Sequence, residues 1–268
     1  MTPLLPRSAG LFAGALATAL LVATPILAAN SFVPVRANSP ALGDIEEHVT
    51  NGALDLPWLN GFGVSNNMQP LTLAPEHPAY NNPSGDHTVA NATNSMAPDS
   101  GGVILTATDP GGVDDYIWEG WIFTGDGNTR RGLVVRANPA NQFASCYQFV
   151  VQSGLFQINF RKLVNSRPTT LATWFASELP AGSLPQNTWH HMKVIAVGST
   201  FRCFIDGHEF TSTGPIVDTT LLTGWPGVYN FRFDLGGVPF LTDDLILTDI
   251  RKTPALPSTW GQVKARWR

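Results

Sequence analysis

Nine short runs of β-branched and aromatic residues, each closed by Gly, Asn, Asp or Pro, constrain this chain more than any other feature. They cover residues 103–108, 116–123, 132–137, 146–152, 155–162, 189–197, 201–206, 228–233 and 240–247. Runs of this length and composition predict strands, and no comparable window carries a helical period. We therefore expect an all-β fold, an antiparallel β-sandwich of the jelly-roll kind.

One predicted hairpin can be read residue by residue. In the segment 204–208, Asp206 and Gly207 supply the positive φ angles that a two-residue turn requires. Alternation along the strand then places Phe201, Cys203 and Ile205 on one face.

Composition agrees with this architecture and narrows the range of partners. Only 13% of residues are charged, whereas Gly numbers 25 and Pro 21, as expected for many strands joined by turns and loops. The net charge is −4 and there is no basic run suited to a phosphate backbone, so we expect no nucleic-acid partner.

The N-terminal residues 1–29 predict a secretory signal peptide. Arg7 precedes an uncharged apolar run at 9–27, and Ala28 and Ala29 are small residues suited to cleavage. A retained membrane anchor is the alternative, because the run approaches the length that spans a bilayer. We expect a secreted or envelope protein of bacterial type, with no membrane span in the mature chain.

The rest of the chain divides into a sandwich domain at 30–250, loop-rich over 30–100, and a tail at 251–268. In the tail, Thr259 could cap a short amphipathic helix with Trp260, Val263 and Trp267 on one face. This ending resembles a short tag of some exported bacterial proteins, which would make the tail a surface-sorting or anchoring signal. The alternative is a tail that packs on its own domain.

A family resemblance begins in residues 187–207. The residues Trp189, His190 and His191, two apolar strand segments and the pair Asp206-Gly207 resemble the "W-H-H … D-G" hairpin of laminin-G-like domains. These domains belong to the concanavalin A-like superfamily.

Four other segments extend the resemblance in consistent order over about residues 103–249. Residues 131–137 and 146–149 resemble the "G-L-x-x-R … Y-x-x" strand pair, especially that of 3-keto-disaccharide hydrolase domains. Residues 224–229 and 243–247 resemble the closing "G-x-x-G-l-y … F-D-D-v-x-v" strands. The resemblance implies a jelly-roll sandwich that binds or processes carbohydrate.

Evidence for catalysis is weak. The E-x-D-x-x-E motif of jelly-roll glucanases is absent, and no G-x-S-x-G nucleophile sequence occurs. If the protein is an enzyme, Glu119, Asp115 and His190 are the candidate acids or bases. On one strand Asp115 and Glu119 would lie about 13 Å apart, farther than the ~5.5 Å of retaining carboxyl pairs. Glu119 could instead pair with Arg131 or Arg136, and we expect His190 to be structural.

Ligand-binding candidates are aromatic and polar residues near one sheet. Flat aromatic faces match the C–H face of a pyranose, and polar side chains flank such platforms. The candidates are Trp118, Trp174, Trp225, Arg136, Gln148 and Arg161. Core packing is the alternative for each Trp, and cross-strand pairing is the alternative for the polar residues.

A structural Ca²⁺ is the one cofactor that the resemblance implies. Members of the superfamily hold such an ion between a residue near the first strand and an Asp on the last, which points here to Asp44 with Asp243 or Asp244. A second acidic group, Asp114, Asp115 and Asp126 with Asn128, could serve instead. The alternative is that these carboxylates lie in solvated turns and bind no ion.

Cys146 and Cys203 are the only cysteines, and an exported protein could join them in a disulfide. Both lie in apolar strand-like runs, so two buried free thiols are the alternative. Cysteine positions in a sequence do not decide between the two.

Three functions remain open at this stage. The first is a secreted carbohydrate-binding or adhesive lectin-like module, and the absent catalytic pair favours it. The second is a glycoside-processing hydrolase, and the third is a structural envelope protein displayed through its tail.

Overall fold

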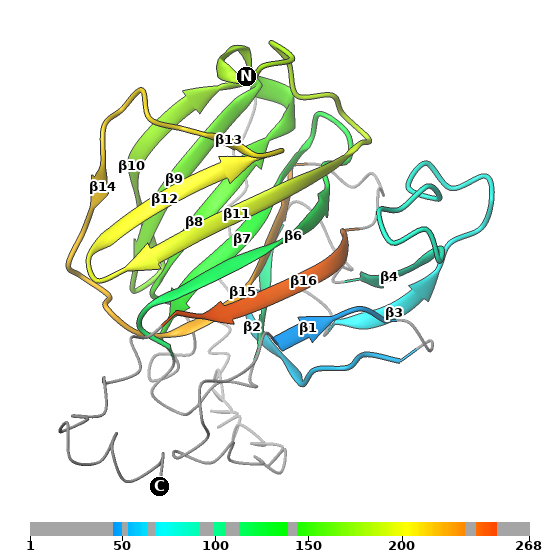
Figure 1. Cartoon of the computed structure of the whole chain (residues 1–268), viewed down its shortest axis with the longest axis horizontal. Helices are drawn as coiled ribbons and strands as arrows, with labels where there is room; N and C mark the ends of the chain where they lie inside the picture. The colour runs from blue at the N-terminus through cyan, green and yellow to red at the C-terminus, as the bar shows by residue number, and fades with distance from the viewer. Residues whose placement is uncertain are drawn as a thin grey trace, which may run out of the picture. The chain divides into compact units, whose positions relative to one another are not determined.

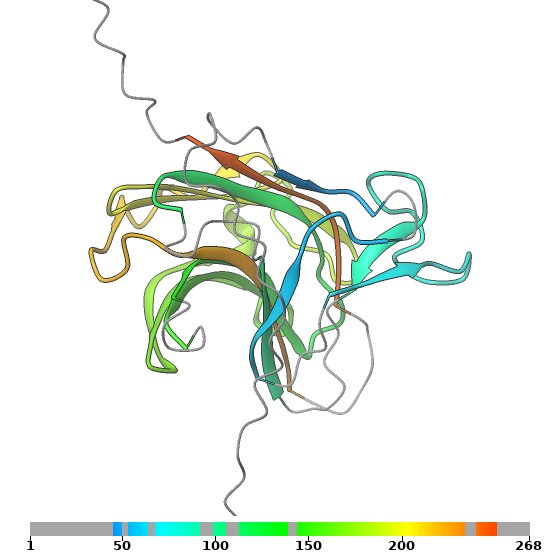
Figure 2. The ribbon, with the colours of Figure 1, turned by 90° about the horizontal axis from the view of Figure 1, so that it is seen from below.

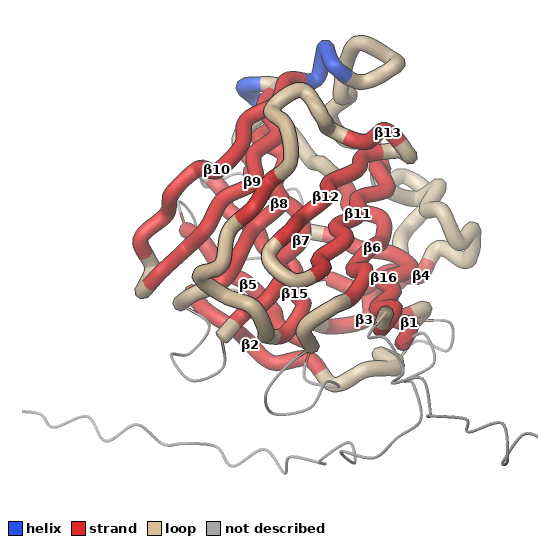
Figure 3. The backbone as a smooth tube through the Cα atoms, turned by 60° about the vertical axis from the view of Figure 1, so that its left-hand side comes forward, coloured by secondary structure: helices blue, strands red, loops and turns tan. Residues whose placement is uncertain are grey.

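A computed structural model describes residues 45–49, 53–63, 68–91, 99–105, 113–138, 144–233 and 240–250. The predicted signal peptide, the predicted tail helix and Asp44 lie outside these ranges. The described strands are β1 (Ile45–Glu47), β2 (Trp58–Gly63), β3 (Gln69–Thr72), β4 (Thr88–Asn91), β5 (Asp99–Leu105), β6 (Tyr116–Phe123), β7 (Thr129–Ala137), β8 (Cys146–Gln152), β9 (Gln157–Val164), β10 (Arg167–Phe175), β11 (Trp189–Val197), β12 (Thr200–Ile205), β13 (His208–Glu209), β14 (Ile216–Val217), β15 (Trp225–Arg232) and β16 (Leu241–Asp249). The described residues also contain two 3₁₀ turns, η2 (Ser153–Leu155) and η3 (Ala176–Glu178) (Figure 3).

The strands form two antiparallel sheets, which Figure 2 shows as two layers. Sheet A has the order β13-β12-β11-β6-β16-β4-β3, with β1 beside β16 and β14 beside β12 (Figure 1). Sheet B has the order β10-β9-β8-β7-β15-β5-β2. The predicted all-β sandwich is confirmed, and β6, β8 and β11 have the predicted bounds.

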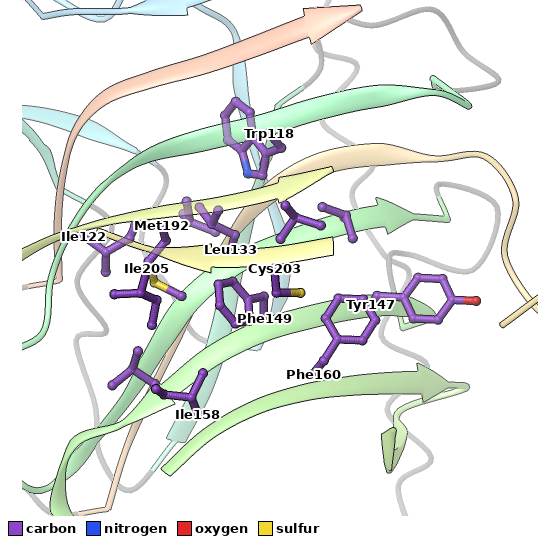
Figure 4. Close-up of a cluster of buried hydrophobic side chains, with 14 of the residues drawn as sticks. Trp118, Ile122, Leu133, Tyr147, Phe149, Ile158, Phe160, Met192, Cys203 and Ile205 are labelled. Atoms are coloured by element: carbon purple, nitrogen blue, oxygen red, sulfur yellow. The ribbon is translucent and has the colours of Figure 1, made fainter. Parts of the chain in front are cut away.

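Three apolar clusters hold the described residues together, and the largest lies between the sheets. Trp118, Met192 and Ile205 reach into it from sheet A, and Phe149 and Phe160 reach into it from sheet B (Figure 4). Because alternate residues of each strand point inward, both sheets supply apolar side chains to one interior.

Segments that the sequence did not predict include the edge strand β10. It contains Pro168, and its ladder with β9 shifts register between Thr170 and Ala172. Proline cannot donate to a ladder, so it is tolerated at a sheet edge. The loop-rich N-terminal region also contains the short strands β1 to β4, which pair with strands of both sheets.

The Asp-Gly hairpin is confirmed. Asp206 has φ 49° and Gly207 has φ 80°, and Ile205 pairs with His208 across the turn. Phe201, Cys203 and Ile205 are all buried, as the predicted alternation requires.

The two cysteines are free and buried, so the structure agrees with the alternative of two free thiols and not with a disulfide. Cys203 lies in the cluster between the sheets, whereas Cys146 belongs to the second cluster, with Trp225 and Tyr229. The thiols thus occupy different packing layers. Burial raises the pKa of Cys146 to about 12 and raises that of Cys203 as well.

Within the described ranges, no helix has the length and apolarity needed to cross a bilayer.

Candidate functional site

Polar side chains gather on the outer face of sheet B, the face turned away from the large core. Directly opposed residues of antiparallel strands point to the same side, so register identifies which side chains share this face. One cross-strand row contains Gln152 of β8, Arg130 of β7 and Phe231 of β15. The row two residues along contains Gly132 and Tyr229, and the next contains Arg161 and Gln148. We call Arg130, Gln148, Gln152, Arg161 and Tyr229 the arginine face.

Gly132 lies at the centre of the arginine face. A Cβ atom there would lie 2.0 Å from the backbone oxygen of Phe149, so no side chain can stand at this position. The guanidinium of Arg161 lies 5.5 Å from the centre of the Tyr229 ring, although β8 and β7 separate their strands.

Arg161 and Gln148 retain unused donors. Arg161 Nη2 donates a hydrogen bond to Gln148 Oε1. In the described part of the chain, Arg161 Nε and Gln148 Nε2 are both buried and have no hydrogen-bond partner. Such groups carry a desolvation cost unless an acceptor reaches them, so they suit a ligand rich in oxygen atoms.

Arg130 lies at the other end of the arginine face. Its Nε and Nη2 donate to Gln152 Oε1 at 3.2 and 2.7 Å, and its guanidinium lies 5.7 Å from the Phe231 ring and 5.5 Å from the Phe233 ring. Burial lowers the pKa of Arg130, and the charge of Arg161 lowers it further, against the hydrogen bond with Tyr229. Both guanidinium groups therefore lie beside Tyr229.

Most side chains of the arginine face are partly or fully buried. Gln148 and Tyr229 are buried, Arg130 and Arg161 are half-buried, and Phe233 beside them is 42% exposed. This arrangement joins hydrogen-bond donors, positive charge and aromatic rings, which together bind polar, hydroxyl-bearing ligands.

Of the predicted ligand residues, Gln148 and Arg161 lie together on the arginine face. Trp225 lies near them, 5% exposed, in the apolar cluster that contains Tyr229. It supports the face from below the surface and does not present an open ring.

The prediction that Trp118 and Trp174 offer faces to sugar is wrong. Both are fully buried in the core between the sheets. Trp118 Nε1 donates to the backbone oxygen of Gly227 at 2.8 Å, and Trp174 stacks with Phe210 at 5.0 Å.

The prediction that Arg136 binds the ligand is also wrong. It has φ 53° at an irregularity of the β7–β15 ladder, and it is fully buried. Its guanidinium donates to the backbone oxygens of Leu221 and Asp114 and lies over the Phe201 ring. Arg136 therefore closes the sandwich and does not line the arginine face.

The three catalytic candidates do not form one site. Glu119 lies on the outer face of sheet A and contacts Lys193 at 2.7 Å and His191 at 3.5 Å. Asp115 accepts a hydrogen bond from the backbone N–H of Gly198. Neither Arg131 nor Arg136 pairs with Glu119, because both belong to sheet B.

His190 holds the hairpin turn in place. Its Nδ1 lies 2.7 Å from Asp206 Oδ2, and its Nε2 lies 3.3 Å from the backbone oxygen of Pro185. His191 points to the opposite face, beside Trp121. The two histidines therefore act separately, as strand alternation predicts.

Asp243 is the predicted calcium ligand with the most unusual environment. Its Oδ2 accepts hydrogen bonds from Asn82 Nδ2 and Ser84 N, both at 3.0 Å, whereas its buried Oδ1 has no partner in the described chain. Burial raises the pKa of Asp243 to about 6. A buried carboxylate with an unused oxygen is suited to a cation.

The loop beside Asp243 offers further oxygen atoms. Asn82 Nδ2 lies within 2.7–3.2 Å of four acceptors: Ser84 Oγ, Asp86 Oδ1, the Thr88 backbone oxygen and Asp243 Oδ2. An amide has only two hydrogens to share among them. The donor set is of the hard-oxygen kind that Ca²⁺ prefers, although no cluster of three or more His, Cys, Asp or Glu in the described ranges is arranged for a metal.

Asp244 does not join Asp243. It has φ 46°, and its Oδ1 lies 2.7 Å from Nδ1 of His48. The second predicted acidic group is also divided, because Asp114 and Asp115 precede β6 whereas Asp126 and Asn128 follow it. An eight-residue strand separates them by about 26 Å.

The sequence-based prediction missed Arg130, Gln152 and Tyr229 in the arginine face, and Asn82 and Asp86 beside Asp243. Arg130 and Gln152 lie at strand ends where the register was unknown. The spacing of Asn82, Ser84 and Asp86 at alternate positions was the available signal for the oxygen-rich loop.

The two antiparallel sheets enclose one apolar core. The fold is an antiparallel β-sandwich of the jelly-roll kind. Among solved structures, this jelly roll is similar to carbohydrate-binding module CBM66 of Bacillus subtilis, with 15% identity, TM-score 0.46 and coverage of 73% of this chain and 94% of that one. It is also similar to β-glucanase of Bacillus licheniformis, with 12% identity, TM-score 0.46 and coverage of 77% and 98%.

The galectin LEC-6 of Caenorhabditis elegans is more distant, with 12% identity, TM-score 0.37 and coverage of 57% of this chain and 93% of the galectin. No protein-family model and no curated protein matches the sequence of this jelly roll. Its function is therefore argued from its own side chains.

Proposed function

We propose that the protein is a secreted carbohydrate-binding module whose ligand lies on the arginine face. The observation that carries the proposal is the pair of buried donors, Arg161 Nε and Gln148 Nε2, that lack an acceptor in the described chain. Sugar hydroxyl and ring oxygens would satisfy them. The ring of Phe233 at the rim supplies an apolar surface for the C–H face of a sugar.

The test is a glycan-array and polysaccharide pull-down screen of the full chain, with product analysis on every hit. Arg161→Met should weaken binding at least tenfold, because it removes a charge-assisted donor. Arg202→Met is the matched control: Arg202 also lies over an aromatic ring, that of Phe204, but on sheet A. Thermal melting checks that both variants fold.

The outcomes separate the three functions left open by the sequence. Binding without products, lost in Arg161→Met and kept in Arg202→Met, supports the proposal. Release of products would favour a glycoside hydrolase. Absence of binding to any glycan would overturn the proposal and favour a structural envelope protein.

Export is part of the proposal and has its own test. Cleavage after Ala29 would give a secreted protein that begins at Asn30. N-terminal sequencing of material recovered outside the cell should therefore read Asn30 first. A full-length protein retained in the membrane fraction would contradict this.

We also propose that a Ca²⁺ ion is held by Asp243 and Asp86 with oxygen atoms of the 82–88 loop. When bound, the ion would supply positive charge that offsets the burial of Asp243. Asn82 would have to turn its amide nitrogen away from the four oxygens that now surround it.

Thermal unfolding with Ca²⁺ and with a chelator tests this site. Ca²⁺ should raise the Tm of the wild type but not that of Asp243→Asn. Asp244→Asn should keep the response, because Asp244 is engaged with His48. An equal response in wild type and Asp243→Asn, or no response in either, would contradict the proposed site.

A further inference from the structure

Charge is distributed unevenly between the two sheets. The strands of sheet B carry seven Arg and Lys residues and one acidic residue, Asp99 of β5. The strands of sheet A carry seven Asp and Glu residues and two Arg or Lys. The chain as a whole has a net charge of −4, so the basic character of sheet B is local.

The arginine face is the part of sheet B where this charge is not compensated. Lys162 is neutralised by Asp218 at 2.6 Å. Arg130 and Arg161 instead donate to the neutral oxygens of Gln152 and Gln148, and no ion pair joins either guanidinium to a carboxylate in the described part of the chain.

Two neighbouring half-buried cations without a counter-charge repel each other, and burial strengthens the repulsion. A neutral sugar would satisfy their hydrogen bonds but leave this repulsion in place. An anionic group between them would satisfy both. Guanidinium groups suit this role because their planar N–H forks match carboxylate and sulfate oxygens.

We infer that the ligand of the arginine face is an acidic polysaccharide, one whose sugar units carry carboxylate or sulfate groups. This inference rests on the proposed carbohydrate-binding function and adds the ligand's charge. Arg130 and Arg161 hold the anionic group, and Gln148 Nε2 donates to a neighbouring oxygen. The exposed ring of Phe233, beside Arg130, lies under the sugar ring.

The experiment compares the same polymer with and without its charge. Binding of the full chain to polygalacturonate and to fully methyl-esterified polygalacturonate is measured by titration calorimetry at 50 and 500 mM salt. The acidic polymer should bind at least tenfold more tightly than its ester, and the higher salt should weaken only the acidic interaction.

Variants then assign the effect to the arginine face. Arg161→Gln should reduce the preference for the acidic polymer about tenfold, whereas Arg161→Lys, which keeps the charge, should retain part of it. Arg202→Gln on sheet A is the matched control and should bind as the wild type does. Dextran sulfate, compared with dextran, tests sulfate as the source of charge, and double-stranded DNA tests a non-carbohydrate polyanion.

Each outcome has a distinct meaning. A preference for polygalacturonate or dextran sulfate that Arg161→Gln removes supports the inference. Equal binding of the acid and its ester overturns the inference and leaves carbohydrate binding standing. Equal binding of DNA and the acidic polysaccharides would also overturn it. Absence of binding to every polysaccharide overturns both proposals.

Discussion

At the residue scale, Asp243 is a buried carboxylate whose environment disfavours its charge. Its side chain is 2% exposed, and its pKa lies near 6 instead of the ordinary 3.8. The folded protein therefore binds this proton more tightly than the unfolded chain does. Because protons stabilise the folded state here, stability falls as the pH rises through the range between the two pKa values.

The free energy of unfolding should therefore decrease as the pH rises. We expect the charged Asp243 carboxylate to lower the free energy of unfolding by about 3 kcal/mol at pH 7 in calcium-free buffer. This loss of stability should develop as the pH rises from about 4 to 6. Urea unfolding at each pH should show the decline in the wild type and a flatter profile in Asp243→Asn. Glu76→Gln changes an exposed loop carboxylate and should leave the wild-type profile intact. A decline that persists in Asp243→Asn would assign it to another group.

Single residues also mark where prediction from sequence fails. Alternation correctly separated Trp118 from Trp121, but it could not decide which of the two faces the core. Leu133 and Val134 are both fully buried on opposite sides of β7. Where both faces of a strand are apolar, hydrophobic pattern alone does not identify the interior.

At the scale of elements, the β7–β8 ladder depends on the close approach at Gly132. A Cβ atom would require the Phe149 backbone oxygen to move, which would break hydrogen bonds of the ladder. This ladder also supports Arg130 and Gln148. The pairing and the arginine face therefore depend on the same residue.

Replacing Gly132 with Ala should destabilise the protein by more than about 3 kcal/mol, measured by urea unfolding. Gly198→Ala is the matched control, because Gly198 has φ 54° but nothing within 4 Å of its would-be Cβ. It should cost only about 1 kcal/mol. Equal costs for the two substitutions would show that the close approach at Gly132 contributes little.

Strand β1 is joined to β16 by a side-chain tether as well as by its ladder. His48 Nε2 lies 2.5 Å from Glu46 Oε2, and its Nδ1 lies 2.7 Å from Asp244 Oδ1. The hydrogen bond with Glu46 and then that with Asp244 raise the pKa of His48 to about 8. The tether is therefore complete at neutral pH.

Because the pKa of His48 is raised in the folded protein, protonated His48 stabilises the folded state. This stabilisation is fully present below pH 6.5 and is lost as the pH rises through 8. The side chain is 35% exposed, so we expect less than about 1 kcal/mol. Hydrogen-exchange protection factors of β1 should fall between pH 7 and 9 in the wild type. In His48→Gln they should be low throughout. Protection that stays constant in the wild type would contradict the tether.

The elements also divide by how far sequence could predict them. Strands β6, β8 and β11 are long and rich in β-branched and aromatic residues, and their bounds were predicted. Strands β1 to β4 have three to six residues and depend on pairing with β5 and β16. Such strands form because a partner is present, and a local window of sequence does not contain the partner.

At the scale of the whole sandwich, the two sheets differ in charge, with sheet B basic and sheet A acidic. The sequence shows only the sum of these charges, because each sheet takes its strands from several separate stretches of the chain. The difference in charge between the two sheets, and the position of the arginine face, depend on which strands pair in each sheet. A sequence without its sheet topology does not contain this information. Electrostatic attraction to a charged surface depends on this local distribution as well as on the net charge.

The protein should therefore bind to a sulfonated cation-exchange matrix at pH 7 and low salt despite its net charge of −4. The double variant Arg130→Gln with Arg161→Gln should elute earlier, at lower salt. Lys193→Gln removes a basic residue from sheet A and should elute close to the wild type, although its net charge changes in the same direction. Identical elution of the wild type and the double variant would show that sheet B does not direct the contact.

The edges of the two sheets have a consequence for behaviour at high concentration. Sheet A ends in β13, with two residues, and β3, with four. Sheet B ends in β2, whose ladder shifts between Asn60 and Phe62, and in β10, which carries Pro168 and a second shift. No edge strand in the described chain offers a long, unbroken template to a neighbouring molecule. Molecules crowded together should therefore resist joining edge to edge into fibrils.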